Sequence, residues 1–182
     1  MEGPNSIEFT MKKKEDGRTM LIRAGIFTAC ITPFLVLTMF LMMFATQFIV
    51  ITAPAIILTI YLVWYTRRFT RIEYEYVIAS GEFSVAAIYD NLSRKELIKN
   101  IKIKDMHKIV PYQTNESLLD APEINQILQY CSDLQDPDLY IAIYEDPKKG
   151  RAAVIFNTSR KLVQIMKFYN GLNVTVKNEF RF

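Results

Sequence analysis

The sequence predicts an α-helical membrane hairpin joined to a cytosolic α+β domain, in which antiparallel strands form a sheet or barrel closed by a C-terminal helix. Two apolar runs, residues 21–45 and 48–66, predict the hairpin, because each is close to the roughly 20 residues that a helix needs to cross a bilayer. Alternating apolar and polar residues beyond position 71 predict the strands. The 182 residues therefore divide into an N-terminal segment (1–20), the hairpin (21–66) and the domain (67–182).

The flanking charges predict the orientation of the hairpin. Basic residues precede the first run and follow the second: Lys12, Lys13, Lys14, Arg18, Arg23, Arg67, Arg68 and Arg71. The turn near Thr46 and Gln47 carries none, and short segments rich in Lys and Arg stay on the cytoplasmic side. We therefore expect a multi-pass protein of the cell membrane, with two spans and both termini in the cytoplasm.

The interior of the two runs predicts an anchor rather than a transport path. No ionisable residue lies in the middle of either run, whereas proton and substrate paths usually contain one. Small residues allow close contact with another helix: Gly25, Ala29, Ala53 and Ala55. A membrane-protein partner or a second copy of the chain is therefore an alternative to contact with lipid alone.

The first half of the domain predicts four strands. Residues 72–79 alternate between an apolar and a polar face, and the dipeptide Ser80-Gly81 is typical of a tight turn to a partner strand at 82–90. A third strand is expected at 94–103, with Lys102 and Lys104 on one face and Ile101 and Ile103 pointing inward. A fourth is expected at 108–112, which Pro111 marks as an edge or an ending.

The middle of the domain predicts a polar connection at 113–138 with one short helix at 122–130. Pro122 stands in the first turn of this helix, where proline is favoured, and three apolar residues share one side: Ile124, Ile127 and Leu128.

The end of the domain predicts a hairpin and a helix. Strands at 139–145 and 151–156 flank a turn at 146–150 that contains both proline and glycine. Asn157 or Thr158 then caps a helix that stops near Gly171. Its apolar face recurs at helical spacing: Leu162, Ile165, Met166 and Tyr169.

A further strand is expected before the hairpin. Ile7, Phe9 and Met11 alternate with polar residues, which is the period of a half-buried strand. Because the two ends of a membrane hairpin emerge on one side, residues 7–12 are able to join the sheet formed after it.

The combined pattern resembles a known architecture. The hairpin, IEYEYVIASGEFSV, RKELIKNIKIKDMHKIVPY and LYIAIYEDPKKGRAAVIFNTSRKLVQIMKFYNG together resemble small bacterial membrane proteins that carry a pleckstrin-homology-like (PH-like) domain. The resemblance covers most of the chain and contains no catalytic motif. It implies a cytosolic scaffold held at the membrane, with lipid or protein partners.

Residue types that perform catalysis or bind metals do not form a recognisable set. His107 is the only histidine and is expected at a bend, so Cys131 has no evident base and is not expected to be a catalytic nucleophile. Asp133, Asp136 and Asp138 lack the glycine-containing spacing of a calcium loop and are expected in a solvated loop. We therefore expect no enzyme activity, cofactor or metal, and the mild net charge of +3 argues against nucleic-acid binding.

One basic stretch predicts a lipid or partner surface. Its six basic residues lie within fifteen positions: Arg94, Lys95, Lys99, Lys102, Lys104 and Lys108. Near an anionic leaflet each such charge contributes roughly 1 kcal/mol of attraction. The alternative is a strand face that serves only solubility.

Two functions fit these expectations. The first is a non-enzymatic, membrane-anchored binding or scaffolding module whose partners are the lipid bilayer and anionic headgroups. The alternative is an accessory subunit of a larger membrane complex in transport or the cell envelope, with a membrane protein or a second copy as its partner.

Overall fold

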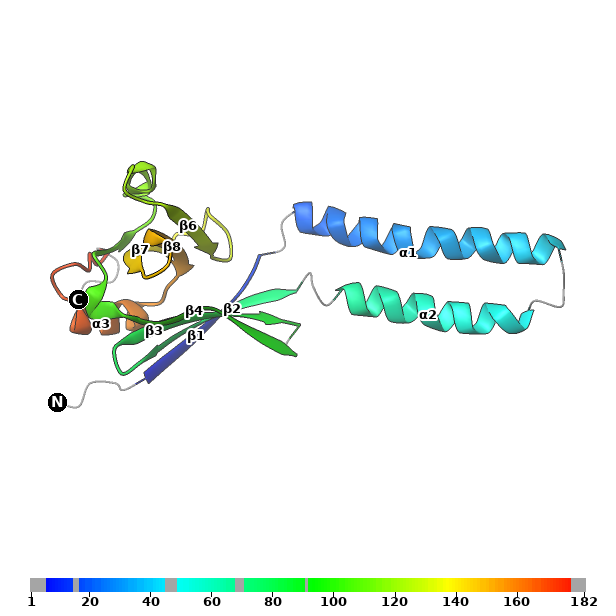
Figure 1. Cartoon of the computed structure of the whole chain (residues 1–182), viewed down its shortest axis with the longest axis horizontal. Helices are drawn as coiled ribbons and strands as arrows, with labels where there is room; N and C mark the ends of the chain where they lie inside the picture. Colours follow the sequence, from blue (N-terminus) through cyan, green and yellow to red (C-terminus); the bar gives the residue numbers. More distant parts are fainter. Residues whose placement is uncertain (1–5, 15–16, 45–48, 68–70, 91, 178–182) are drawn as a thin grey trace. The chain divides into compact units, whose positions relative to one another are not determined.

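The computed structural model describes residues 6–14, 17–44, 49–67, 71–90 and 92–177 (Figure 1). These residues form two compact units, which are described separately. One unit contains the helical segment between Glu15 and Ile72. The other combines the residues before that segment with those after it, so the folded β-rich unit is discontinuous in sequence.

The helical unit consists of α1 (Gly17–Phe44) and α2 (Ile49–Arg67), which pack against each other. Among the described residues, Met20–Phe40 is long and apolar enough to cross a bilayer, whereas the second apolar stretch, Ile56–Thr66, is shorter. The first predicted span therefore meets this criterion and the second does not reach it.

The Thr28 hydroxyl donates to the carbonyl of Ala24 at 2.8 Å, which satisfies a polar group within its own helix. The predicted turn at Thr46 and Gln47 lies outside the described residues.

The first sheet of the β-rich unit, called sheet A, has the order β1-β2-β3-β4. Its strands are β1 (Ser6–Lys12), β2 (Ile72–Ala79), β3 (Glu82–Tyr89) and β4 (Ser93–Lys102). The predicted strand before the helices is present, since β1 pairs antiparallel with β2 from Ser6 opposite Ala79 to Lys12 opposite Glu73. The alternating exposure of β1 matches its alternating sequence, with apolar side chains on the half-buried face.

The turn between β2 and β3 has the predicted geometry. Ser80 and Gly81 both have positive φ, +51° and +80°, as a tight two-residue hairpin turn requires. A Cβ atom at Gly81 would lie 3.0 Å from the ring of Tyr169, so both backbone and packing favour glycine there.

Gly81→Ala is expected to lower the free energy of unfolding of the β-rich unit by about 1–2 kcal/mol, because it adds left-handed strain and a contact with Tyr169. Urea unfolding of the full chain in detergent, followed by tyrosine fluorescence, measures the change. Ser80→Gly is the control, since it removes a side chain from a residue with positive φ. An equal loss in both variants would contradict the explanation.

The second sheet, sheet B, has the order β5-β7-β8-β6. Its strands are β5 (Lys108–Pro111), β6 (Gln126–Tyr130), β7 (Leu139–Asp146) and β8 (Gly150–Asn157). β5 is an edge strand of this sheet, as Pro111 indicates. Short 3-10 helices precede β5 and β6: η3 (Ile103–Asp105) and η4 (Glu116–Asp120).

The helix predicted at 122–130 is wrong. Residues 126–130 form β6, which pairs in parallel with β8, so the sheets are not wholly antiparallel. The Asn125 N–H donates to the carbonyl of Arg151 and its side-chain amide to that of Lys149, which aligns the incoming chain along β8. Exposure then alternates along β6, and pairing with a neighbouring strand outweighs the weak local preference for a helix.

The C-terminal helix α3 (Arg160–Tyr169) is present, but its cap differs from the prediction. Ser159, rather than Asn157 or Thr158, is the N-cap, and its hydroxyl accepts a hydrogen bond from the N–H of Leu162 at 3.3 Å. The helix ends at Tyr169, with Asn170 as its C-cap, and the Asn170 amide donates to the carbonyls of Ile103 and Met106 at 2.8 Å. These two hydrogen bonds hold the end of α3 against η3 and the residue that follows it.

The core lies between the two sheets and α3. The ring of Phe156 on β8 is 5.1 Å from that of Phe83 on β3 and 5.9 Å from that of Tyr76 on β2, measured between centroids. All three side chains are fully buried. Phe9 on β1 stacks on Tyr76 at 6.1 Å, so the strand before the helices contributes to the same core.

Candidate binding surfaces

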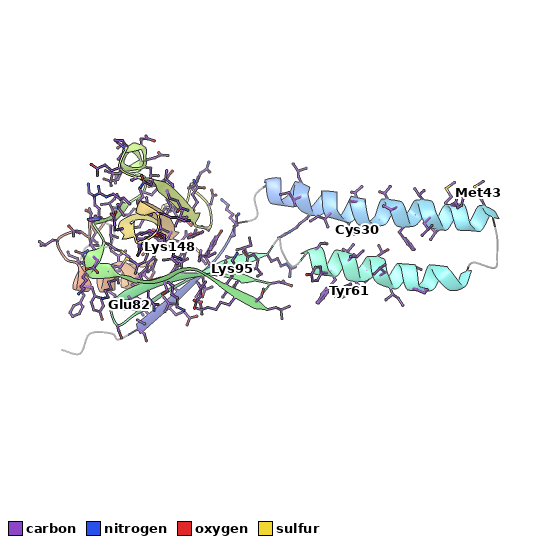
Figure 2. All side chains as sticks on the ribbon, in the orientation of Figure 1. Cys30, Met43, Tyr61, Glu82, Lys95 and Lys148 are labelled. Atoms are coloured by element: carbon purple, nitrogen blue, oxygen red, sulfur yellow. The ribbon has the colours of Figure 1, made fainter. Side chains whose placement is uncertain are left out.

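The predicted basic stretch does not form one surface. Arg94 and Lys95 lie near the start of β4, beside the β3–β4 turn, whereas Lys102 ends β4 opposite Glu82. Figure 2 shows Glu82 and Lys95 towards opposite ends of sheet A. Lys104 lies in η3 and Lys108 begins β5 of sheet B.

The predicted inward and outward alternation is only partly correct. Ile103 is fully buried and Ile101 half-buried, as predicted. However, β4 ends at Lys102, so Lys104 does not extend its face. The pairing of β3 with β4 also shifts register between Phe83 and Ala86, and Asn100 takes a positive φ of 52°. These irregularities rule out the single strand face that was expected for Lys102 and Lys104.

Two of the six residues of the basic stretch, Arg94 and Lys99, form ion pairs with glutamates. Arg94 pairs with Glu75 and Glu96, and Lys99 lies 3.3 Å from Glu96. The carboxyl of Glu75 also hydrogen-bonds that of Glu8, which raises the pKa of Glu8. Among the described residues of the basic stretch, four lysines form no salt bridge: Lys95, Lys102, Lys104 and Lys108. The outer face of sheet A is therefore a mixed-charge surface rather than a basic one.

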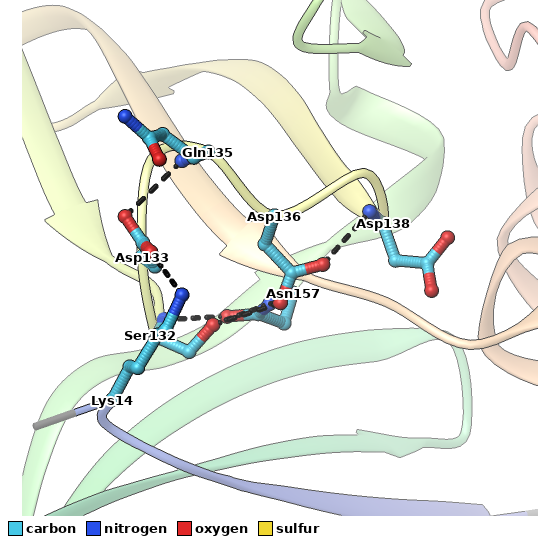
Figure 3. A network of polar contacts seen from close by, with 7 residues as sticks. All are labelled: Lys14, Ser132, Asp133, Gln135, Asp136, Asp138 and Asn157. Carbon is cyan, nitrogen blue, oxygen red and sulfur yellow. Dashed lines mark hydrogen bonds and ion pairs between the residues drawn. The ribbon is translucent and has the colours of Figure 1, made fainter.

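The acidic loop after β6 is a structural network (Figure 3). Asp136 accepts hydrogen bonds from the Asn157 amide at 2.8 Å and the Ser132 hydroxyl at 2.9 Å. Its other oxygen accepts from the N–H of Asp138 at 3.0 Å. The prediction of a merely solvated loop is wrong for Asp136, because fully buried Asn157 was not recognised as its partner.

Asp133, in the same loop, faces the segment that follows β1. Its carboxylate accepts from the N–H of Gln135 and lies 3.1 Å from the Lys14 amine, and these contacts lower its pKa. Among the described residues, no group of three or more His, Cys, Asp or Glu side chains is arranged to hold a metal ion.

Cys131 and His107 have different surroundings. Burial raises the pKa of the Cys131 thiol to about 11, which is the opposite of the change that activates a nucleophile. His107 is exposed, and its Nε2 lies 3.6 Å from Glu145. These surroundings indicate that Cys131 packs in the core and that His107 is a surface residue.

A groove between β1 and α3 was not predicted. It has a volume of about 490 Å³, and its lining combines the start of β1 with one side of the helix: Ser6, Ile7, Lys161, Gln164, Ile165 and Phe168. Phe168 is 67% exposed because it falls outside the apolar face of α3, which is the sequence signal that was missed.

A second unpredicted surface, here called the tether edge, lies where the chain leaves and rejoins the β-rich unit. It contains Lys13 and Lys14 after β1, and the paired Lys12 and Glu73 place this segment beside the start of β2. The β3–β4 turn lies at the same end of sheet A, because β3 runs back from Gly81. The loop after β6 joins it, since the Lys14 N–H donates to the carbonyl of Ser132 at 3.3 Å.

One of three comparisons with known proteins identifies a family for the chain. A family model described as a bacterial PH-like domain (DUF6106) matches residues 6–176, which includes both β1 and the helices inserted after it. No curated protein and no solved structure matches the chain.

Proposed function

Because the chain belongs to the family of bacterial PH-like domains DUF6106, we propose that it is a non-enzymatic binding module anchored in the cell membrane by α1 and α2, with the β-rich unit in the cytosol. The proposal combines the family fold with the inserted pair of apolar helices.

The pairing of β1 with β2 is the observation that carries the proposal. A chain that crossed a membrane once between Lys12 and Glu73 would leave the two strands on opposite sides, where they could not pair along seven residues. If the chain crosses a membrane between them, this pairing requires an even number of crossings. This supports a second span in α2, in addition to the span that α1 offers.

The dimensions and charges of α2 also support two spans. Its 19 residues give a helix about 28 Å long, close to the roughly 30 Å of a hydrocarbon core. The basic residues on the outer ends of both helices favour a cytosolic β-rich unit.

Reporter fusions at Met1 and Phe182 are expected to signal the cytoplasm at both ends, because an even number of crossings and the flanking charges act together. A reporter placed between Thr46 and Gln47 should signal the other side of the membrane. A cytoplasmic signal from this central position would contradict the two-span anchor, and opposite signals from the two termini would contradict the even number of crossings.

The alternative proposal, an accessory subunit of a membrane complex, is favoured by the groove between β1 and α3. Ile7 and exposed Phe168 offer apolar surface for a protein partner there. Purification in mild detergent separates the two proposals. Recovery of a membrane protein in stoichiometric amount, and its loss when Phe168→Ser is introduced, would support the accessory subunit. Purification of the chain alone with its native lipid would support the binding module.

A further inference from the structure

The chain itself limits how far the tether edge lies from the helices. Four residues separate Lys12 from Gly17, and four separate Arg67 from Ile72. Each connection spans at most about 18 Å when fully extended. If the helices lie in a bilayer, as the proposed function holds, Lys12 and Ile72 remain within this distance of the cytosolic ends of the helices.

The tether edge carries exposed leucines on two separate loops. Leu92, in the β3–β4 turn, is 63% exposed, and Leu134, in the loop after β6, is 41% exposed. Large apolar side chains at the tips of neighbouring loops, rather than on a strand face, are suited to enter a lipid interface. The exposed Phe168 lies in α3 near the opposite end of sheet A, since the next residue, Tyr169, packs beside Gly81 in the β2–β3 turn.

The charges of the edge point to a headgroup contact of modest strength. Lys12 pairs with Glu73 and Lys14 with Asp133, so these cations are already partly neutralised. In the part of the chain that the structure describes, Lys13 and Lys95 form no salt bridge and are exposed.

We infer that the tether edge docks on the anionic cytosolic leaflet, with Leu92 and Leu134 in the interface and Lys13 and Lys95 on lipid phosphates. The inference rests on the proposed membrane anchor. The two connections keep the edge at a high effective concentration at the lipid surface, so a contact too weak for a free domain is well populated here. The contact involves the tether edge rather than the distal lysines of the predicted stretch.

Tryptophan quenching by brominated lipid tests this contact in the full chain. Trp64 is the only tryptophan, so Trp64→Phe gives a silent background for Leu92→Trp and for its control Phe168→Trp. The two test positions are matched in exposure, 63% and 67%. In nanodiscs of anionic brominated lipid, we expect Leu92→Trp to lose most of its fluorescence and Phe168→Trp to keep it. Equal quenching at both positions, or none at position 92, overturns the inference.

The unmodified chain separates this inference from the proposed anchor. Trp64 lies in α2, so its quenching by the same lipid reports the anchor. Quenched Trp64 with unquenched Leu92→Trp rejects the docking alone, whereas unquenched Trp64 rejects the anchor. Adding Lys13→Glu and Lys95→Glu should weaken docking by about tenfold or more, measured as recovered fluorescence at position 92. Unchanged quenching would remove the headgroup contact from the inference.

Discussion

Asn157→Ala is expected to lower the free energy of unfolding of the β-rich unit by about 3 kcal/mol. The side chain is fully buried, and its oxygen accepts from the Ser132 N–H at 2.6 Å. Its amide donates to Ser132 and Asp136. Alanine would leave a buried donor and a carboxylate without these partners, and such losses cost about 1–3 kcal/mol each. Urea unfolding of the full chain in detergent measures the difference.

Asn125→Ala is the matched control, because this amide is exposed and makes one hydrogen bond, to the carbonyl of Lys149 at 3.1 Å. It should cost less than about 1 kcal/mol. Asn157→Asp adds a second test, since a carboxylate would then face Asp136. Its stability should recover as the pH falls and one of the two carboxylates is protonated. Similar losses in both alanine variants would contradict the special role of Asn157.

Removing β1 is expected to have the larger effect. A chain that begins at residue 67 lacks the strand that pairs with β2 and places Phe9 on Tyr76. The loss of three half-buried apolar side chains should cost about 4 kcal/mol or more, a large share of the stability of a typical domain. We expect this fragment to show exposed tyrosines, broad unfolding and a tendency to aggregate through the open edge of β2.

A chain in which Lys14 is joined directly to Arg71 is the control for this prediction. Lys12 and Glu73 are opposite each other, so residues 13, 14, 71 and 72 would form a four-residue hairpin loop. This soluble protein should unfold cooperatively. If the fragment from residue 67 proved as stable, β1 would not be part of the core.

Local sequence patterns correctly predicted the strands and the turn that depend mainly on neighbouring residues. The alternation of residues 72–79 and the dipeptide Ser80-Gly81 determine β2 and its turn without help from distant residues. The same alternation identified β1, although its partner strand begins sixty residues later. The resemblance to PH-like domains is confirmed by the family match over residues 6–176.

The errors arose where distant residues decide the local structure. β6 was predicted as a helix because its parallel partner β8 lies more than twenty residues further along the chain. Asn157 or Thr158 was predicted as the helix cap, yet the Asn157 amide donates to Ser132 and Asp136 in the preceding loop. The basic stretch looked continuous in sequence, but a shift of register and the end of β4 distribute it over both ends of the sheet.

The interrupted β1–β2 pair also imposes an order on synthesis. β1 is made first but has no partner until both helices have been translated, and closing so long a loop has an entropic cost that grows with its length. Packing of α1 against α2 brings the ends of that loop together and offsets this cost. On the proposed two-span anchor, a failure of α2 to insert would leave β1 and β2 in different compartments. β1 would then lack its partner and β2 would present an open edge, so on this proposal a completed sheet A requires that both helices have been inserted.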